Sequence, residues 1–150
     1  MSALDAFFDS YYRLRPVNAT FTGIHDHDQR LPDWSPDGLA SALDEMRALR
    51  ASLIAGRPGS VSLHQTAGRD RELAIAFLDV QIAEHESDCG QRGNPSLAAG
   101  EAIFGVISLM TRPFAPIAER ADAAIDHRRG ADGVAREIAS RMRRRAASPG

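Results

Sequence analysis

Two short segments of the chain hold residue types that bind metal ions in proteins. The first is the sequence His25-Asp26-His27-Asp28, in which imidazole and carboxylate groups alternate. Both groups bind zinc and other divalent ions, but adjacent residues cannot all turn toward one ion, and a tight site needs three or four supported ligands. We therefore interpret this segment as a solvated or capping loop and keep a metal site that uses His25 and His27 as the alternative.

The second segment is "HESDC", which runs from His85 to Cys89 and resembles the zinc-protease signature H-E-x-x-H with cysteine in the last place. On a helix, the four-residue spacing would put His85 and Cys89 on one face with Glu86 beside them. Gly90 follows directly and predicts that the helix ends where the second ligand must be held rigidly. The acidic residues here also fit an ordinary solvated helix face. We assign no catalytic, cofactor-binding or metal-binding residue, with His85 and Cys89 as alternative metal ligands.

Other sequence motifs that carry chemistry are missing from the chain. There is no G-x-S-x-G nucleophile motif, no phosphate-binding loop and no dinucleotide fingerprint. Cys89 is the only cysteine, which excludes an internal disulfide and a CxxC-type zinc site. The basic segment "RRRAASPG" has no aromatic residue for stacking on bases and no recognisable nucleic-acid-binding fold upstream. We expect no cofactor in this chain and no nucleic-acid partner.

The elements that must position these groups are helical, because apolar residues recur at helical spacing along most of the chain and no strand alternation competes. Ser2 followed by Asp5, and Ser35 followed by Pro36, are N-terminal helix signals. The predicted fold class is all-α, with about five helices. They are expected at residues 2–15, 36–55, 63–88, 96–110 and from about 116 onward, with a short helical turn at 17–21.

The helix predicted from residue 96 to 111 is apolar around nearly its whole circumference. It carries Leu97, Ile103, Phe104, Val106, Ile107, Leu109 and Met110. Such a helix needs cover on several sides. The predicted helices 2–15, 36–55 and 63–88 are expected to cover one or two of them. The remaining apolar surface predicts self-association or contact with helices that this segment does not contain.

Length and composition place the chain among globular proteins. Of its 150 residues 43% are hydrophobic and 25% charged, which is enough to build one buried core. The most apolar segment, 102–110, is far too short to span a bilayer, and no basic stretch followed by an apolar run opens the chain. We expect a cytoplasmic protein with no membrane partner.

Charge is distributed unevenly, and every one of the 18 basic residues is arginine. Residues 1–127 hold 11 arginines and 18 acidic residues, a net charge of −7, whereas residues 128–150 hold 7 arginines and 2 acidic residues, a net charge of +5. Helical periodicity also weakens after Asp126. We divide the chain into a helical region, 1–126, and a divergent arginine-rich tail, 127–150. The tail is interpreted as a shifted reading frame, a disordered end or the basic tail of a genuine short protein.

Several stretches, taken in their order and spacing, resemble the opening of the bacterial family called domain of unknown function 885. They are Pro16, Ala19-Thr20, Gly23, the segment Leu31-Pro32-Asp33-Trp34-Ser35-Pro36, Asn94-Pro95 and the turn from Arg112 to Pro116. The resemblance covers residues 3–126. This family is similar to helical zincin metallopeptidases, and its H-E-x-x-H helix lies far downstream of the region matched here.

The resemblance implies a function for this chain and for its longer relatives. It implies a non-catalytic N-terminal helical segment of a zincin-like metal-dependent peptidase or hydrolase, truncated before the metal site. Zinc is implied for full-length relatives, and none of the family's catalytic or metal-binding positions falls on this chain. The alternatives are a free-standing helical protein-interaction module and a small metal-binding protein that uses His25 and His27.

Overall fold

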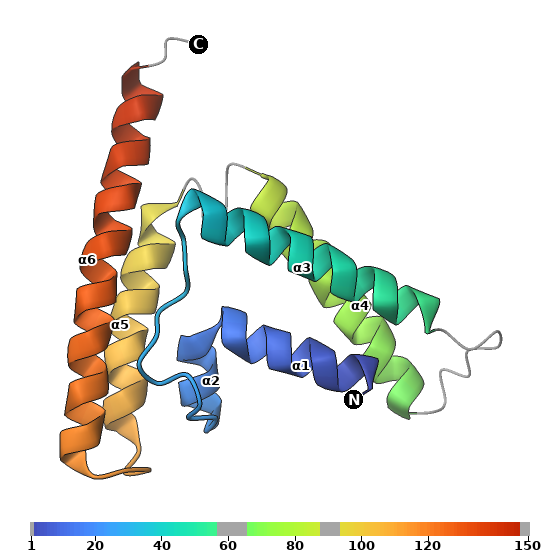
Figure 1. The fold of residues 1–150 in the computed structure, drawn as a ribbon, viewed down its shortest axis with the longest axis horizontal. Coiled ribbons are helices and arrows are strands. Elements are labelled where there is room, and N and C mark those ends of the chain that lie inside the picture. Colours follow the sequence, from blue (N-terminus) through green and yellow to red (C-terminus); the bar gives the residue numbers. More distant parts are fainter. Residues whose placement is uncertain (1, 57–65, 88–93, 148–150) are drawn as a thin grey trace.

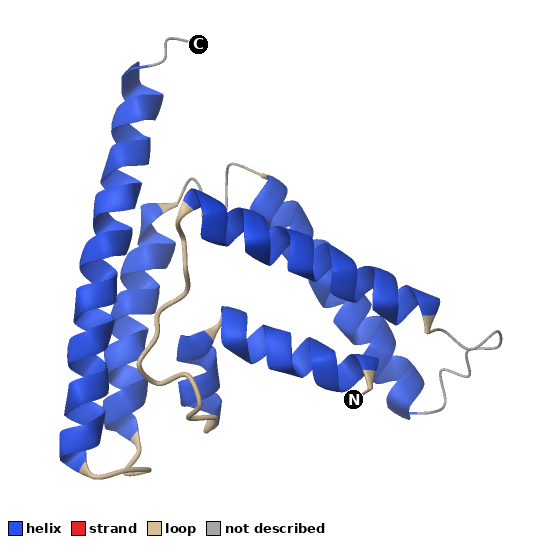
Figure 2. Ribbon diagram, viewed as in Figure 1, coloured by secondary structure: helices blue, strands red, loops and turns tan. Residues whose placement is uncertain are grey.

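The computed structural model describes residues 2–56, 66–87 and 94–147, and within these ranges the chain is built from helices and loops without a strand (Figures 1 and 2). The predicted all-α class is therefore confirmed. The six helices are α1 (Ala3–Leu14), α2 (Pro16–Thr22), α3 (Pro36–Ala55), α4 (Thr66–Glu86), α5 (Pro95–Thr111) and α6 (Ile117–Ala147). None of the helices in the described ranges combines the length and the apolar character needed to cross a membrane.

Helix starts follow the local capping chemistry that the sequence predicts. At α1, the Ser2 hydroxyl accepts a hydrogen bond from the Asp5 N–H (3.1 Å), and the Asp5 carboxylate accepts one from the Ser2 N–H (2.7 Å). At α3, the Ser35 hydroxyl accepts a hydrogen bond from the Gly38 N–H at 3.0 Å. These bonds satisfy N–H groups that have no partner inside the helix. Gly23 ends α2 with φ of 97°, a left-handed conformation that favours glycine.

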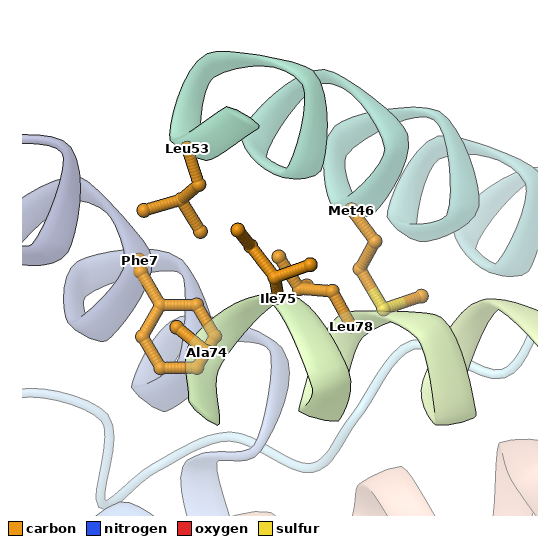
Figure 3. Close-up of a cluster of buried hydrophobic side chains, with 6 residues drawn as sticks. All are labelled: Phe7, Met46, Leu53, Ala74, Ile75 and Leu78. Carbon is orange, nitrogen blue, oxygen red and sulfur yellow. The ribbon is translucent and has the colours of Figure 1, made fainter. Parts of the chain in front are cut away.

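Helices α1, α3 and α4 pack around one apolar core (Figure 3). Leu53 and Met46 of α3 point toward α4, which contributes Ile75 and Leu78, and Phe7 of α1 closes the side of the cluster. Leu53 is 0% exposed and Met46 2% exposed. The large side chains of three helices therefore bury one another, and this region closes its own core.

Helices α5 and α6 form an antiparallel pair beside this three-helix region, with α2 and the loop at 23–35 between them (Figure 1). The turn between α5 and α6 is held by Arg120, whose guanidinium donates hydrogen bonds to the carbonyl oxygens of Ala115 (3.0 Å) and Leu109 (3.2 Å). The Leu109 carbonyl is one of those at the C-terminal end of α5 that the helix itself leaves without a donor, and the Ala115 carbonyl lies in the turn.

Of the three helices predicted to cover one or two sides of the apolar helix, only α3 shares a buried cluster with α5, through Leu39 and Ala98, and the main neighbours of α5 are α6 and α2. The face of α5 that turns inward is mostly small. It consists of Ala98, Gly105, Ser108 and Leu109. Small side chains let the partner backbone approach closely, so the larger apolar residues of α5 are left on the outside.

The weaker helical periodicity after Asp126 does not end the last helix, since α6 continues without a break to Ala147. Alanine and arginine are strong helix formers, so this segment needs little packing to stay helical. Contacts along the helix support it: the Arg136 guanidinium donates to the Asp132 carbonyl oxygen at 3.2 Å, and the Arg144 guanidinium to the Ser140 hydroxyl at 2.5 Å. A change of region at residue 126 stays a prediction from charge.

Two predicted breaks lie largely outside the described residues. Of the break at 56–60 only Gly56, the residue that ends α3, is described. Of the loop at 89–95 only the last two residues are described, so Cys89 is not placed. The ends predicted for the helix at 63–88 fall beyond the described range as well, and α4 runs from Thr66 to Glu86.

Candidate functional site

The histidine-rich loop between α2 and α3 is fixed by its own side chains. The Asp28 carboxylate accepts a hydrogen bond from the Thr20 hydroxyl at 2.6 Å and lies 3.0 Å from Nδ1 of His25. The His25 ring stacks on Phe114, in the turn between α5 and α6, with ring centroids 3.6 Å apart and planes inclined by 14°. His25 and Asp28 therefore attach the loop to the α5–α6 turn, which the capping interpretation did not foresee.

His27 does not join His25 in a cluster of ligands. Its side chain forms no hydrogen bond or ion pair with a described residue. It lines a cavity together with His25, Asp26 and Asp28, and with Asp26 it also borders a groove beside α1. Within the ranges 2–56, 66–87 and 94–147, no group of three or more histidine, cysteine, aspartate or glutamate side chains lies close enough to share a metal ion. The geometry of this loop serves packing between elements.

The segment that resembles a zinc-protease signature lies at the end of α4. His85 is 7% exposed, and its Nδ1 lies 2.9 Å from the Gln81 carbonyl oxygen of the preceding turn. Glu86 is the last residue of α4 and forms an ion pair with Arg47 of α3 at 2.6 Å. Glu86 therefore connects α4 to α3, whereas this bond of His85 lies within α4.

Arg15 lies at the bend between α1 and α2, where its guanidinium contacts side chains of two helices. Its guanidinium carbon is 5.2 Å from the ring centre of Tyr11 and 5.0 Å from that of Phe77, distances typical of cation–π contacts. It also donates a hydrogen bond to the Gln81 side chain of α4. Burial lowers the pKa of Arg15 below its ordinary value. Arg15 thus links the bend to α4.

A cavity of about 390 Å³ opens next to Arg15 and is bordered by α1, α3, α5 and the loop before α3. Glu101 of α5 faces it without a hydrogen bond or ion pair to a described residue, and burial raises the pKa of its carboxyl although the charge of Arg15 acts in the opposite direction. Glu45, at the same cavity, is engaged by Arg13 and Ser10. Burial raises the pKa of Glu45, but these hydrogen bonds lower it by more.

The groups around this cavity do not form a catalytic arrangement. Its lining residues hold arginines, carboxylates and His85, but no serine, threonine or cysteine nucleophile paired with a base. The charged groups that are engaged, Arg13 with Glu45 and Arg15 with Gln81, hold helices together. Hydrogen bonding to a small polar molecule is the chemistry this cavity offers.

The contact between α5 and α6 places a histidine against a glycine. His127 of α6 is 1% exposed, and neither ring nitrogen has a hydrogen-bond partner. A Cβ atom added at Gly105 of α5 would meet the His127 ring, lying 3.0 Å from its Cε1 atom. Burial lowers the pKa of His127, although the backbone and charge of Asp28 act in the opposite direction. Sequence reasoning missed this contact. One pattern could have found it: His127 lies four residues after Ala123, on the same side of the helix, and both are buried.

Among the described helices, α5 has the most exposed large apolar side chains. We call this set the α5 apolar face; it comprises Leu97 (41% exposed), Ile103 (59%), Phe104 (61%), Val106 (38%), Ile107 (46%) and Met110 (39%). Single exposed apolar residues are common on proteins, but six on one helix form a contiguous patch, and such patches mark interaction sites. The sequence predicted an open apolar surface at this helix, and these exposures agree with it.

Comparison with known proteins returned no similarity: no protein-family model, curated protein or solved structure matches the chain.

Proposed function

We propose that this chain acts by binding and not by catalysis, as a helical segment that packs through the α5 apolar face against helices from outside the chain. The observation that carries this proposal is the exposure of large side chains on α5, above all Ile103 and Phe104, which are 59% and 61% exposed. Burying one such side chain fully stabilises a contact by about 1.5–3 kcal/mol. A partner that covers several of them would gain enough to bind stably.

The proposed partner is the catalytic helical region of a zincin-like peptidase-family protein, as the resemblance of residues 3–126 implies. The chemistry of the α5 apolar face supports a helical, apolar partner. The only charged residue of α5 is Glu101, which faces the cavity beside Arg15 and not this surface. A surface without charge selects apolar side chains in preference to an acidic or basic ligand.

Binding without chemistry is supported by the roles of the titratable side chains that the sequence singles out. His25 is stacked on Phe114 and lies against Asp28, and Glu86 is paired with Arg47. Each of these side chains has a partner from another element and contributes to packing. In this proposal the zinc and the catalytic groups belong to the partner region.

The binding proposal is tested with the purified chain and two charge-introducing variants, Phe104→Glu and Ile107→Glu. We expect the unmodified chain to be helical by circular dichroism, to bind a hydrophobic dye and to associate as its concentration rises. Each variant is expected to lower both signals, because a carboxylate in the patch is costly to bury. Leu73→Glu is the matched control, since Leu73 of α4 is 68% exposed and lies outside the α5 apolar face. Equal effects of all three variants would contradict the proposal.

Zinc titration tests whether the chain has a metal site of its own. We expect zinc to bind no more tightly than to an ordinary pair of surface histidines. One equivalent bound with submicromolar affinity, and lost in His25→Ala or His85→Ala, would favour a metal-binding protein instead.

A second candidate function is a free-standing helical interaction module. The buried cluster of Phe7, Met46, Leu53, Ile75 and Leu78 favours it, because α1, α3 and α4 close this core without help. A monomer with a sharp thermal transition and no dye binding would support this module over the segment of a larger protein.

A further inference from the structure

A groove of about 780 Å³ runs beside α1 and is lined by apolar and acidic side chains, with Arg13 and His27 also at its border. We call it the acidic groove; it is bordered by Phe8, Asp9, Tyr12, Ile24, Asp26 and Leu49. Phe8 is 49% exposed, so a large aromatic surface lies open in it. The α5 apolar face contributes no residue to this groove, which makes it a separate surface.

The charge of the acidic groove is set by Asp9 and Asp26. Both are exposed, and neither forms a hydrogen bond or ion pair with a described residue. Glu45 also borders the groove, but Arg13 neutralises it. The groove therefore presents apolar surface beside two carboxylates whose charge is not balanced locally. A helix with one apolar face and flanking basic residues complements such a groove.

The end of α6 combines one exposed apolar side chain, Met142, with exposed arginines. Ile138 packs against the buried cluster of Trp34, Leu39 and Ala98, whereas Met142, one turn further along the same face, is 57% exposed. The nine residues from Ala139 to Ala147 extend α6 by about 13 Å at a rise of 1.5 Å per residue. Figure 1 shows this end of α6 projecting beyond α5.

Basic residues lie on either side of Met142 in the sequence. Arg136 and Arg143 are exposed and lie seven residues apart, which places them on the same side of α6. We call the segment 136–147 of α6 the basic end. Met142 supplies a flexible side chain with a polarizable sulfur, which packs well against aromatic rings.

We propose that the basic end of α6 in one copy docks into the acidic groove of a second copy, with Met142 against Phe8 and with Arg136 and Arg143 facing Asp9 and Asp26. A copy cannot fill its own groove, because α6 is a continuous helix that points away from α1 (Figure 1). The second copy is favoured by charge, since residues 1–127 carry a net charge of −7 and residues 128–150 a net charge of +5.

This contact joins different surfaces on the two copies, so it is head-to-tail. Each added copy presents a new groove or a new basic end, and an assembly of this kind grows with concentration unless it closes into a ring. Its ionic part is sensitive to salt, since the Debye length falls from about 10 Å at 0.1 M to about 3 Å at 1 M. Salt that is excluded from protein surfaces, such as sulfate, has the opposite effect on an apolar contact.

The test uses sedimentation velocity of the full chain and two charge-reversed variants. One carries Arg136→Glu with Arg143→Glu, and the other carries Asp9→Arg with Asp26→Arg. Each is expected to weaken association about tenfold or more, because reversing two ion pairs replaces attraction by repulsion. The matched control is Arg112→Glu with Arg128→Glu, which makes the same change of charge at exposed positions away from the basic end.

Mixing the two charge-reversed variants gives the decisive result. One retains the acidic groove and the other the basic end, and their reversed surfaces, an acidic end and a basic groove, also attract each other. We expect neither variant to associate alone, whereas the mixture should associate with the two variants alternating, and high salt should dissociate it. The inference is overturned if the unmodified chain stays monomeric or if each charge-reversed variant alone associates as the unmodified chain does. Association that the charge-reversed variants leave unchanged and that Phe104→Glu removes would belong to the α5 apolar face alone.

Discussion

The two parts of the molecule bury their contacts in different ways. Helices α1, α3 and α4 meet through large apolar side chains such as Leu53, Ile75 and Leu78, which are at most 4% exposed. The inward side of α5 has small residues, one buried large side chain, Leu109, and a close contact between Gly105 and His127 of α6. The first kind of contact removes much apolar surface from water, whereas the second brings two backbones close while large side chains remain outside.

This difference assigns different roles to the two parts. A core of large side chains supplies most of the free energy of folding. A close-packed pair whose large apolar side chains point outward retains surface for a partner. Stability is therefore expected to depend mainly on the three-helix region, and binding mainly on α5.

The largest predicted effect tests this division of stability. Leu53→Ala, at a side chain that is 0% exposed, is expected to lower the free energy of unfolding by about 2–5 kcal/mol through lost burial and a residual cavity. Phe104→Ala, at a side chain that is 61% exposed, is expected to change it by less than about 0.5 kcal/mol. Urea denaturation of both variants measures the difference. Similar losses would mean that α5 belongs to the folding core.

The second prediction concerns the close approach of α5 and α6. Gly105→Ala is expected to cost about 1–3 kcal/mol, because the new methyl group would meet the His127 ring and force the helices apart. Gly100→Ala is the matched control in the same helix. A Cβ there meets nothing within 4 Å, and removing a helical glycine is expected to stabilise by about 0.5–1 kcal/mol. Thermal denaturation of the two variants should show shifts of opposite sign.

The third prediction tests the loop that connects the two parts. Asp28→Ala removes the acceptor for the Thr20 hydroxyl and the carboxylate beside His25. We expect a loss of about 1.5–3 kcal/mol, as for other hydrogen bonds to a charged group. Faster proteolysis within residues 24–35 would accompany it. Unchanged stability and unchanged proteolysis would show that the stacking of His25 on Phe114 is enough to hold the loop.

The smallest expected effect is a pH dependence that arises from His127. Burial lowers its folded pKa, so the unfolded chain binds more protons in the interval below the ordinary value of about 6.5. The full free energy of unfolding should be reached above that value. It should fall as the pH drops below it, because the unfolded chain then takes up a proton on His127 that the folded chain does not. Denaturation between about pH 5 and 8 measures this slope. His127→Leu should flatten it, and an unchanged slope would assign it to other groups.

The helix starts could be predicted because their signals are local. Ser2 with Asp5, and Ser35 with Pro36, act on N–H groups within three residues, and the structure has the expected bonds at both places. The inward face of α5 could not be predicted in the same way. Apolar residues surround that helix, so periodicity does not distinguish its sides, and the small residues that pack against α6 resemble gaps in the pattern.

The candidate sites show the same limit. His25 and His85 drew attention by residue type, yet the partners of their side chains, Phe114 and the Gln81 carbonyl oxygen, follow from the tertiary and helical geometry. His127 was assigned to the arginine-rich tail, 127–150, because that segment was defined by its charge. Its burial depends on Gly105, which is 22 positions earlier in the sequence, and no local pattern connects the two residues.

Hydrogen–deuterium exchange of the full chain at two protein concentrations tests the central claim most directly. At low concentration, the amides of α3 and α4 around Leu53 and Leu78 should be the most protected, and those of α5 should exchange faster. Raising the concentration should slow exchange in α5 when its apolar face becomes covered, and Phe104→Glu should abolish this effect. Equal protection of α4 and α5 that does not change with concentration would contradict the division into a closed core and an open binding face.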